Sequence, residues 1–293
     1  TTIDSRMQAY AEEAVRQHVA GTLQPAFERE GNGNRNWPYD RNRTQDEVKK
    51  MLRRSMRQSE RYLRMKSLNA TDEQIERAFN TPVEMTVYSP HGDVDTTMTP
   101  LDSIRYYKTF LRSGFMAMDP YTGHVKAYVG GLDFKHFQYD MASTGRRQVG
   151  STIKPFLYAL AMENGMSPCD EAPNVQKTYY TDAGQAWTPR NGSRARYGEM
   201  VTLKWGLQQS NNWISAYLMS KLAPANLVEL LHSFGIMNRA IVPSMSLCLG
   251  PCDISVQEMV SAYTAFVARG IRAAPMYITR IVDSDGTTLA EFQ

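Results

Sequence analysis

The sequence predicts an α+β fold, because segments with helical apolar periodicity alternate with short segments that have the pattern of strands. Residues 151–164 and 256–269 both repeat apolar side chains at intervals of three and four, as an amphipathic helix does. Residues 115–129 instead form two apolar runs around a turn rich in Asp, Pro and Gly, which indicates a β-hairpin. With 293 residues, of which 42% are hydrophobic, the chain can bury a sizeable core in one or two domains.

The first part of the chain is predicted to be mainly helical. A helix over 2–29 has Asp4 as its N-cap, and the turn-rich stretch 31–34 follows it. An exposed amphipathic helix over 44–67 and a helix over 72–79 come next, and then a strand over 83–88 and a helix over 99–110. The basic face of 44–67 could contact an anionic membrane surface or polymer, although a solvated helix face is the simpler interpretation.

The second part begins with the hairpin and continues into the helix near Ser151. Residues 165–200 contain several Pro and Gly and are expected to cross the surface beside the start of that helix. Two helical segments then meet at residues 210–212. A short helix at 227–234, the helix over 256–269, and a strand and turn over 276–286 complete the chain.

Bulk composition gives little evidence for a charged partner, a metal or a membrane segment. A formal charge of +3, from 33 basic and 30 acidic residues, is too balanced to indicate nucleic acid. Cys169 is isolated, while Cys248 and Cys252 form one C-x-x-x-C without a second ligand pair. We therefore expect no metal and no cofactor. No run has the length of a membrane span, and the opening at Thr1 suggests an excised piece with any anchor outside it.

Ser151 and Lys154 are the candidate nucleophile and base. Residues three apart share one face of a helix, so the amine can approach the hydroxyl. An unprotonated amine could take the hydroxyl proton, and backbone N–H groups at the helix start could hold an oxyanion. Alone, however, S-x-x-K favours a capped core helix with a solvated lysine, so the catalytic assignment depends on other motifs.

The other motifs supply that context. A turn with the pattern D-P-x-T-G, S-x-x-K at 151–154 and S-x-N at 210–212 follow one another along the chain. The last two resemble the first two motifs of the penicillin-recognising serine transpeptidases and β-lactamases. The flanking residues resemble the transpeptidase domain of class A penicillin-binding proteins; they are Arg147, Gln148, Gly150, Pro155, Phe156, Thr188, Pro189, Asn191, Leu249, Gly250, Val256, Met259, Ala262 and Tyr263.

The resemblance implies the β-lactamase and penicillin-binding transpeptidase fold, an α/β sandwich with a helical cluster and a mainly antiparallel sheet. It makes 1–30 an N-terminal helix of that domain after an absent glycosyltransferase domain, 31–112 a charged helical linker or insert, and 113–293 the incomplete transpeptidase domain. The family's third motif, K-[TS]-G, does not occur in the sequence, although Thr287 and Thr288 follow Gly286. Truncation before the last strands explains this better than degeneration, so we expect impaired acylation of this piece.

The resemblance also implies the chemistry. Ser151 would attack the penultimate D-alanine carbonyl of a peptidoglycan stem peptide, with Lys154 as its base, and an amine of a second stem peptide would resolve the acyl-enzyme. Ser210 would relay a proton to the leaving amine, and Asn212 would bind Lys154 or the substrate amide. Further substrate contacts are expected from Thr188, Asn191 and Trp213. β-Lactams would acylate the same serine.

The implied partners are peptidoglycan stem peptides on lipid-linked precursor and nascent glycan, β-lactam antibiotics and cell-wall synthesis proteins. The domain is expected on the periplasmic side of the inner membrane, with a single-pass anchor outside this sequence. A serine β-lactamase is one alternative, but no E-x-x-L-N follows Ser210 to supply a deacylating carboxylate. A non-catalytic penicillin-binding scaffold or sensor is the other, with 31–112 as its interaction surface.

Overall fold

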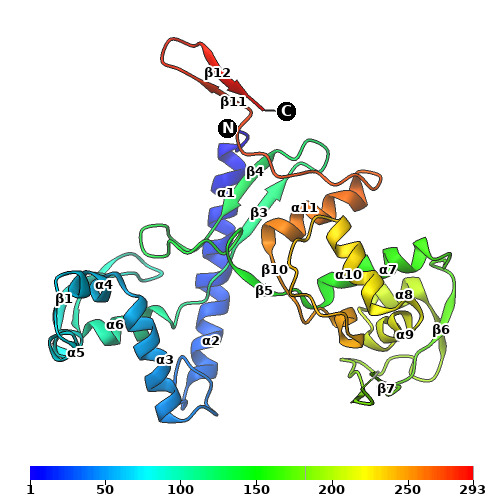
Figure 1. The fold of residues 1–293 in the computed structure, drawn as a ribbon, viewed down its shortest axis with the longest axis horizontal. Helices are drawn as coiled ribbons and strands as arrows, with labels where there is room; N and C mark the ends of the chain where they lie inside the picture. The colour runs from blue at the N-terminus through cyan, green and yellow to red at the C-terminus, as the bar shows by residue number, and fades with distance from the viewer. Residues whose placement is uncertain (182, 293) are drawn as a thin grey trace. The chain divides into compact units, whose positions relative to one another are not determined.

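The computed structural model describes residues 1–181 and 183–292, and their contacts form two compact units (Figure 1). The larger unit, unit 1, combines Thr1–Asp4, Met116–Tyr128 and the chain from Met141 onward. Unit 2 combines Ser5–Phe115 with Val129–Asp140. Within the described residues, no helix is both long enough and apolar enough to cross a bilayer.

Unit 2 begins with the predicted N-terminal helix. It consists of α1 (Ser5–Val15), a π-helical segment η1 (Arg16–Leu23) and α2 (Gln24–Gly31). The π-helical segment contains Gly21 and the β-branched Thr22, both poor helix formers. Pro25 falls in the first turn of α2, where its missing N–H removes the fewest helical hydrogen bonds.

The predicted single helix over 44–67 is wrong, because Ser59 divides it into α3 (Gln45–Gln58) and α4 (Glu60–Ser67). Ser59 has an extended backbone, and its hydroxyl accepts a hydrogen bond from the Tyr62 N–H at 3.3 Å. A serine there is a strong N-cap, so it starts a new helix instead of continuing the old one.

The remaining elements of unit 2 agree with the predictions except at one strand. Helices α5 (Asp72–Asn80) and α6 (Pro100–Tyr107) lie close to their predicted ranges, as does strand β1 (Val83–Val87). Strand β2 (Val94–Met98) was not predicted; it pairs antiparallel with β1. Its sequence of Val, Asp, two Thr and Met lacks the apolar alternation that marks a half-buried strand.

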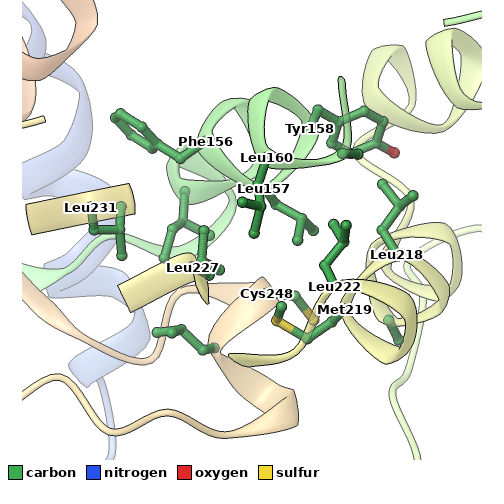
Figure 2. Packing of buried hydrophobic residues seen from close by; sticks show 14 of the residues in the cluster. Phe156, Leu157, Tyr158, Leu160, Leu218, Met219, Leu222, Leu227, Leu231 and Cys248 are labelled. Carbon is green, nitrogen blue, oxygen red and sulfur yellow. The ribbon is translucent and has the colours of Figure 1, made fainter. Parts of the chain in front are cut away.

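Unit 1 is built around five helices, α7 (Lys154–Glu163), α8 (Leu203–Gln208), α9 (Asn212–Leu222), α10 (Pro224–Ser233) and α11 (Val256–Val267). Figure 2 shows how side chains of α7, α9 and α10 meet around the buried thiol Cys248. Among the fully buried members of this core are Phe156, Leu157, Leu218, Met219, Leu227 and Leu231. Helices α7 and α9 thus rest on a shared apolar core, which fixes where their first residues lie.

The strands of unit 1 form short two-stranded pairs instead of one wide sheet. Strand β3 (Phe115–Met118) pairs with β4 (Val125–Val129), as the hairpin pattern predicts. Four other pairs are antiparallel: β5 (Arg146–Gln148) with β10 (Asp253–Ser255), β6 (Glu171–Pro173) with β9 (Met200–Thr202), β7 (Tyr179–Tyr180) with β8 (Ala186–Trp187), and β11 (Arg280–Val282) with β12 (Thr288–Glu291).

The predicted strand over 276–282 is shorter than expected. Only residues 280–282 form a strand, whereas Met276 makes an isolated parallel bridge to His124 in the hairpin. The hydroxyl of Thr2 donates to the carbonyls of Val125 and Met276, both at 2.8 Å. The chain's first residues therefore join the hairpin to the segment that follows α11.

Candidate active site

Ser151 lies on a 3₁₀ turn, η2 (Gly150–Ile153), and α7 begins only at Lys154. The predicted α-helix therefore starts three residues later than expected, and Ser151 lies in the 3₁₀ turn that precedes it. In a 3₁₀ turn the side chains at i and i+3 are eclipsed, so Ser151 and Lys154 still face the same side. Ser151 is exposed, whereas Lys154 is buried.

The backbone before Ser151 is held by the segment before α11. Strand β5 runs into it while paired with β10, and the Gly150 N–H donates to the Gly250 carbonyl at 3.0 Å. Gly250 has φ +71°, and a Cβ added there would lie 2.1 Å from the Gly150 carbonyl oxygen. Only glycine allows this close approach, so Gly250 sets the position of the turn that carries Ser151.

Tyr263 of α11 holds the same turn from its other side. Its hydroxyl donates to the Thr152 carbonyl at 2.6 Å. A carbonyl in a single 3₁₀ turn has few backbone partners, so a side-chain donor stabilises it. Tyr263, one of the residues that resemble the family, therefore helps to hold the turn that carries Ser151.

Lys154 is the electrostatic centre of the site. The residue is 1% exposed, and its ammonium donates to the Ser210 carbonyl at 2.6 Å, to Asn212 Oδ1 at 2.7 Å and to Ser210 Oγ at 3.1 Å. Burial lowers its pKa from 10.5 to about 8, because the charged form loses hydration. Cys248 lies nearby, and a thiolate there would raise the pKa of Lys154. Burial raises the pKa of the Cys248 thiol to about 12, so this thiol is neutral at physiological pH.

Ser210 occupies a strained turn between α8 and α9. Its φ is +49°, and for a residue with a Cβ this conformation costs about 1 kcal/mol. Neighbouring hydrogen bonds hold the turn: the Ser210 N–H donates to Leu207 and the Asn211 N–H to Gly206, both at 2.9 Å. The strain directs both oxygen atoms of Ser210 at the Lys154 amine, as is common at functional sites.

Asn212 joins the amine to the neighbouring loop. Its Oδ1 accepts from Lys154, while its Nδ2 donates to the Arg190 carbonyl at 2.7 Å. Its backbone N–H donates to Asn191 Oδ1 at 2.9 Å. Because every polar atom of the Asn212 side chain has a fixed role, the amide orientation is determined by its partners.

A pocket of about 230 Å³ opens beside these residues. Of the predicted site residues, Ser151, Ser210, Asn212 and Asn191 line it; the other lining residues are Gly192, Ser193, Ala195, Trp205, Gln209 and Asn211. The polar side chains among these described lining residues are hydroxyls, amides and one indole, and none of the lining side chains is ionisable. Such a surface suits a ligand with amide donors and acceptors, such as a peptide backbone.

Two predicted substrate contacts lie elsewhere. Trp213 is 5% exposed, and its indole N–H donates to the Pro189 carbonyl at 3.1 Å, so it supports the loop from behind. Thr188 is exposed and shares a 2.7 Å hydrogen bond with Thr178. Neither residue lines the pocket, and a substrate contact by either stays a prediction.

Comparisons with known proteins bear directly on the motif assignment. The family model for the penicillin-binding protein transpeptidase domain matches residues 113–292, and the model for the penicillin-binding protein middle domain matches 34–111. The chain belongs to the penicillin-binding protein transpeptidase family. The resemblance inferred from Ser151, Lys154 and the S-x-N motif is thereby confirmed.

Curated relatives of this penicillin-binding transpeptidase are named penicillin-binding protein 1A. The protein from Aquifex aeolicus is 32% identical over 182 residues, which cover 62% of this chain and 25% of the relative. The protein from Escherichia coli K12 is 31% identical over 182 residues, with 62% and 21% covered. The chain thus spans about a quarter of the length of the curated relatives that it matches.

Solved structures support the fold. The crystal structure of penicillin-binding protein 1A from Haemophilus influenzae aligns with a TM-score of 0.67 at 22% identity, covering 100% of this chain and 45% of that one. The PonA1 protein from Mycobacterium tuberculosis, solved in complex with penicillin V, gives a TM-score of 0.53 at 20% identity, with 82% and 64% covered. The predicted penicillin-binding transpeptidase fold, with mixed helix and sheet, is confirmed.

We expect Gly250→Ala to destabilise the protein by about 2 kcal/mol or more, because the new Cβ adds a backbone clash to the strain of a positive φ. Chemical denaturation measures the change. Gly270→Ala is the matched control: Gly270 has φ +86° with no atom within 4 Å of an added Cβ, so it should lose only about 1 kcal/mol. Equal losses for both variants would contradict a role for the Gly150 contact.

Proposed function

We propose that this chain carries the D,D-transpeptidase site of a peptidoglycan cross-linking enzyme that is acylated by β-lactams. One observation carries the proposal: the buried Lys154 amine, with a lowered pKa, contacts Ser210 and Asn212 beneath the pocket that Ser151 lines. A buried amine with a pKa near neutrality is suited to proton transfer, whereas a solvated lysine is not.

In the proposed first step, Ser151 Oγ attacks the carbonyl carbon of the penultimate D-alanine and the hydroxyl proton passes to the unprotonated Lys154 amine. The backbone N–H of Ser151 supplies one donor to the developing oxyanion. The peptide bond to the terminal D-alanine then breaks, and the leaving amine takes up a proton by way of the Ser210 hydroxyl. The product is an ester of Ser151 with the shortened stem peptide.

The hydrogen bonds of Lys154 suggest how that amine becomes available. An ammonium has three N–H donors, and here the three contacts are to the Ser210 carbonyl, Asn212 Oδ1 and Ser210 Oγ. The contact to Ser210 Oγ is the longest, at 3.1 Å. Ser210 Oγ is also the only one of these acceptors that can donate a proton in return, so it is the natural partner of the neutral amine.

In the second step an amine of another stem peptide attacks the ester and forms the cross-link, and Ser151 regains its proton. The peptide bond that was broken supplies the driving force, so no nucleotide is required. Water in place of the amine would give a carboxypeptidase. The proposal includes a glycosyltransferase domain and a membrane anchor elsewhere in the natural protein, an extracytoplasmic site and cell-wall synthesis proteins as partners.

Ser151→Ala should abolish labelling of the natural gene product by a fluorescent penicillin, because the acyl acceptor is removed. In-gel fluorescence measures the label. Ser193→Ala is the control, since Ser193 lines the same pocket and should leave the label in place. Continued labelling of the Ser151 variant, or loss with the Ser193 variant alone, would refute the assignment.

The acylation rate should rise about tenfold per pH unit below pH 8 and level off above it, because only the neutral Lys154 amine accepts the proton. Stopped-flow acylation across pH 6 to 10 measures the profile. Asn212→Asp should move its midpoint to higher pH, since a carboxylate beside the amine favours the ammonium. A profile without a rise between pH 6 and 8 would show that Lys154 is not the base.

A further inference from the structure

Asn174 is a fully buried side chain in the loop-rich part of unit 1, outside all the motifs of the sequence. Its Nδ2 donates to two consecutive carbonyls, those of Ala195 at 2.9 Å and Arg196 at 2.8 Å. Its Oδ1 accepts from Asn211 Nδ2 at 2.9 Å. All the polar atoms of this buried amide therefore have partners, which is the arrangement that fixes a side chain in one orientation.

The backbone of Asn174 binds the same loop. Its N–H donates to the Glu199 carbonyl at 2.9 Å, and its carbonyl accepts from the Gly198 N–H at 3.0 Å. The residue thus makes four hydrogen bonds to the segment 195–199. That segment directly continues the pocket wall, which residues 191–193 and 195 form.

Asn211 is the middle residue of the S-x-N motif, and it is buried. Its Oδ1 caps α9 by accepting from the N–H groups of Trp213 at 2.9 Å and Ile214 at 3.0 Å. Its Nδ2 donates to Asn174. One amide therefore holds both the start of α9 and the loop that forms the pocket wall.

We propose that Asn174 and Asn211 are positioning residues, which hold the segment 195–199 and thereby fix the pocket-lining residues 191–193 and 195 relative to Ser210 and Asn212. The inference rests on the proposed function for its activity readout. The wall and the proton-relay groups lie on separate chain segments. The bonds of Asn212 to Asn191 and Arg190 join them at one end of the loop, and the buried amide pair joins the segment 195–199 to the turn 210–212. A shift of about 1 Å between substrate-binding and reacting groups is enough to slow a reaction strongly.

The test replaces single atoms of this link. Asn174→Asp turns the group facing the Ala195 and Arg196 carbonyls from a donor into an acceptor. Asn211→Asp keeps the α9 cap, since aspartate accepts from the same N–H groups, but removes the donor to Asn174. Both variants should be acylated by penicillin about tenfold or more slowly than the wild type in the natural gene product.

Asn164→Asp makes the same chemical change at an exposed position and is the first control. Its amide donates to Leu160 at 2.8 Å at the end of α7, outside the pocket, so the same change should leave acylation unaltered. Ile236→Val controls for stability, because it trims the buried core without touching either loop. The melting temperature of each variant is measured together with its acylation rate. If the core variant loses as much acylation as the Asn174 and Asn211 variants for the same fall in melting temperature, the effect is one of stability and the inference fails.

A double-mutant cycle with Asn174→Ala and Asn211→Asp decides whether the two residues act as one unit. We expect the double variant to be acylated about as slowly as the slower single variant. Fully additive effects would overturn a shared role, as would normal acylation of both singles in a protein that still requires Ser151. If even the wild type is not acylated, the proposed function fails, and the positioning role is tested without activity.

The readout is then amide hydrogen exchange at residues 191–199. If Asn174→Asp leaves the protection of these amides the same as in the wild type, the inference is overturned.

Discussion

The site depends on one buried charge. Placing the Lys154 ammonium out of water opposes folding at neutral pH, because burial lowers its pKa by disfavouring the charged form. The Ser210 carbonyl and hydroxyl and the Asn212 amide offset part of this cost, and the strained turn at Ser210 exists to present them. Helices α7 and α9 must therefore keep a fixed spacing, which their common apolar core provides.

Around this charge, support comes from residues remote in the sequence. Gly250 and Tyr263 hold the Ser151 turn, while Asn191 holds the backbone of Asn212. None of these contacts is local in the chain. The catalytic motifs are short, but the geometry that would make them reactive is distributed over unit 1.

Two features of the sequence allowed correct predictions: the spacing of the catalytic motifs and the apolar repeats of the long helices. The order and spacing of S-x-x-K and S-x-N predicted that Ser151, Lys154, Ser210 and Asn212 belong to one site, and the structure places all four at one pocket and its floor. The long helices were also predictable from their apolar repeats. Asn174 was not, because an amide in an aperiodic loop gives no signal until its partners are known. Strands β5 and β10 were not predicted for a related reason. Each has only three residues and pairs with a partner about a hundred residues away in the sequence, so neither has a recognisable local pattern.

The lining of the pocket has a consequence for recognition. The described side chains that line it offer amides and hydroxyls, and the cationic Lys154 is buried next to them. Hydrogen bonds of this kind depend on shape and direction, and dissolved salt screens them far less than it screens exposed charges. The hydrogen bonds of the pocket lining should therefore change little with ionic strength. Any salt dependence of a ligand's affinity should arise from charged neighbours such as Arg196, whose guanidinium lies 5.5 Å from the centre of the Trp205 ring.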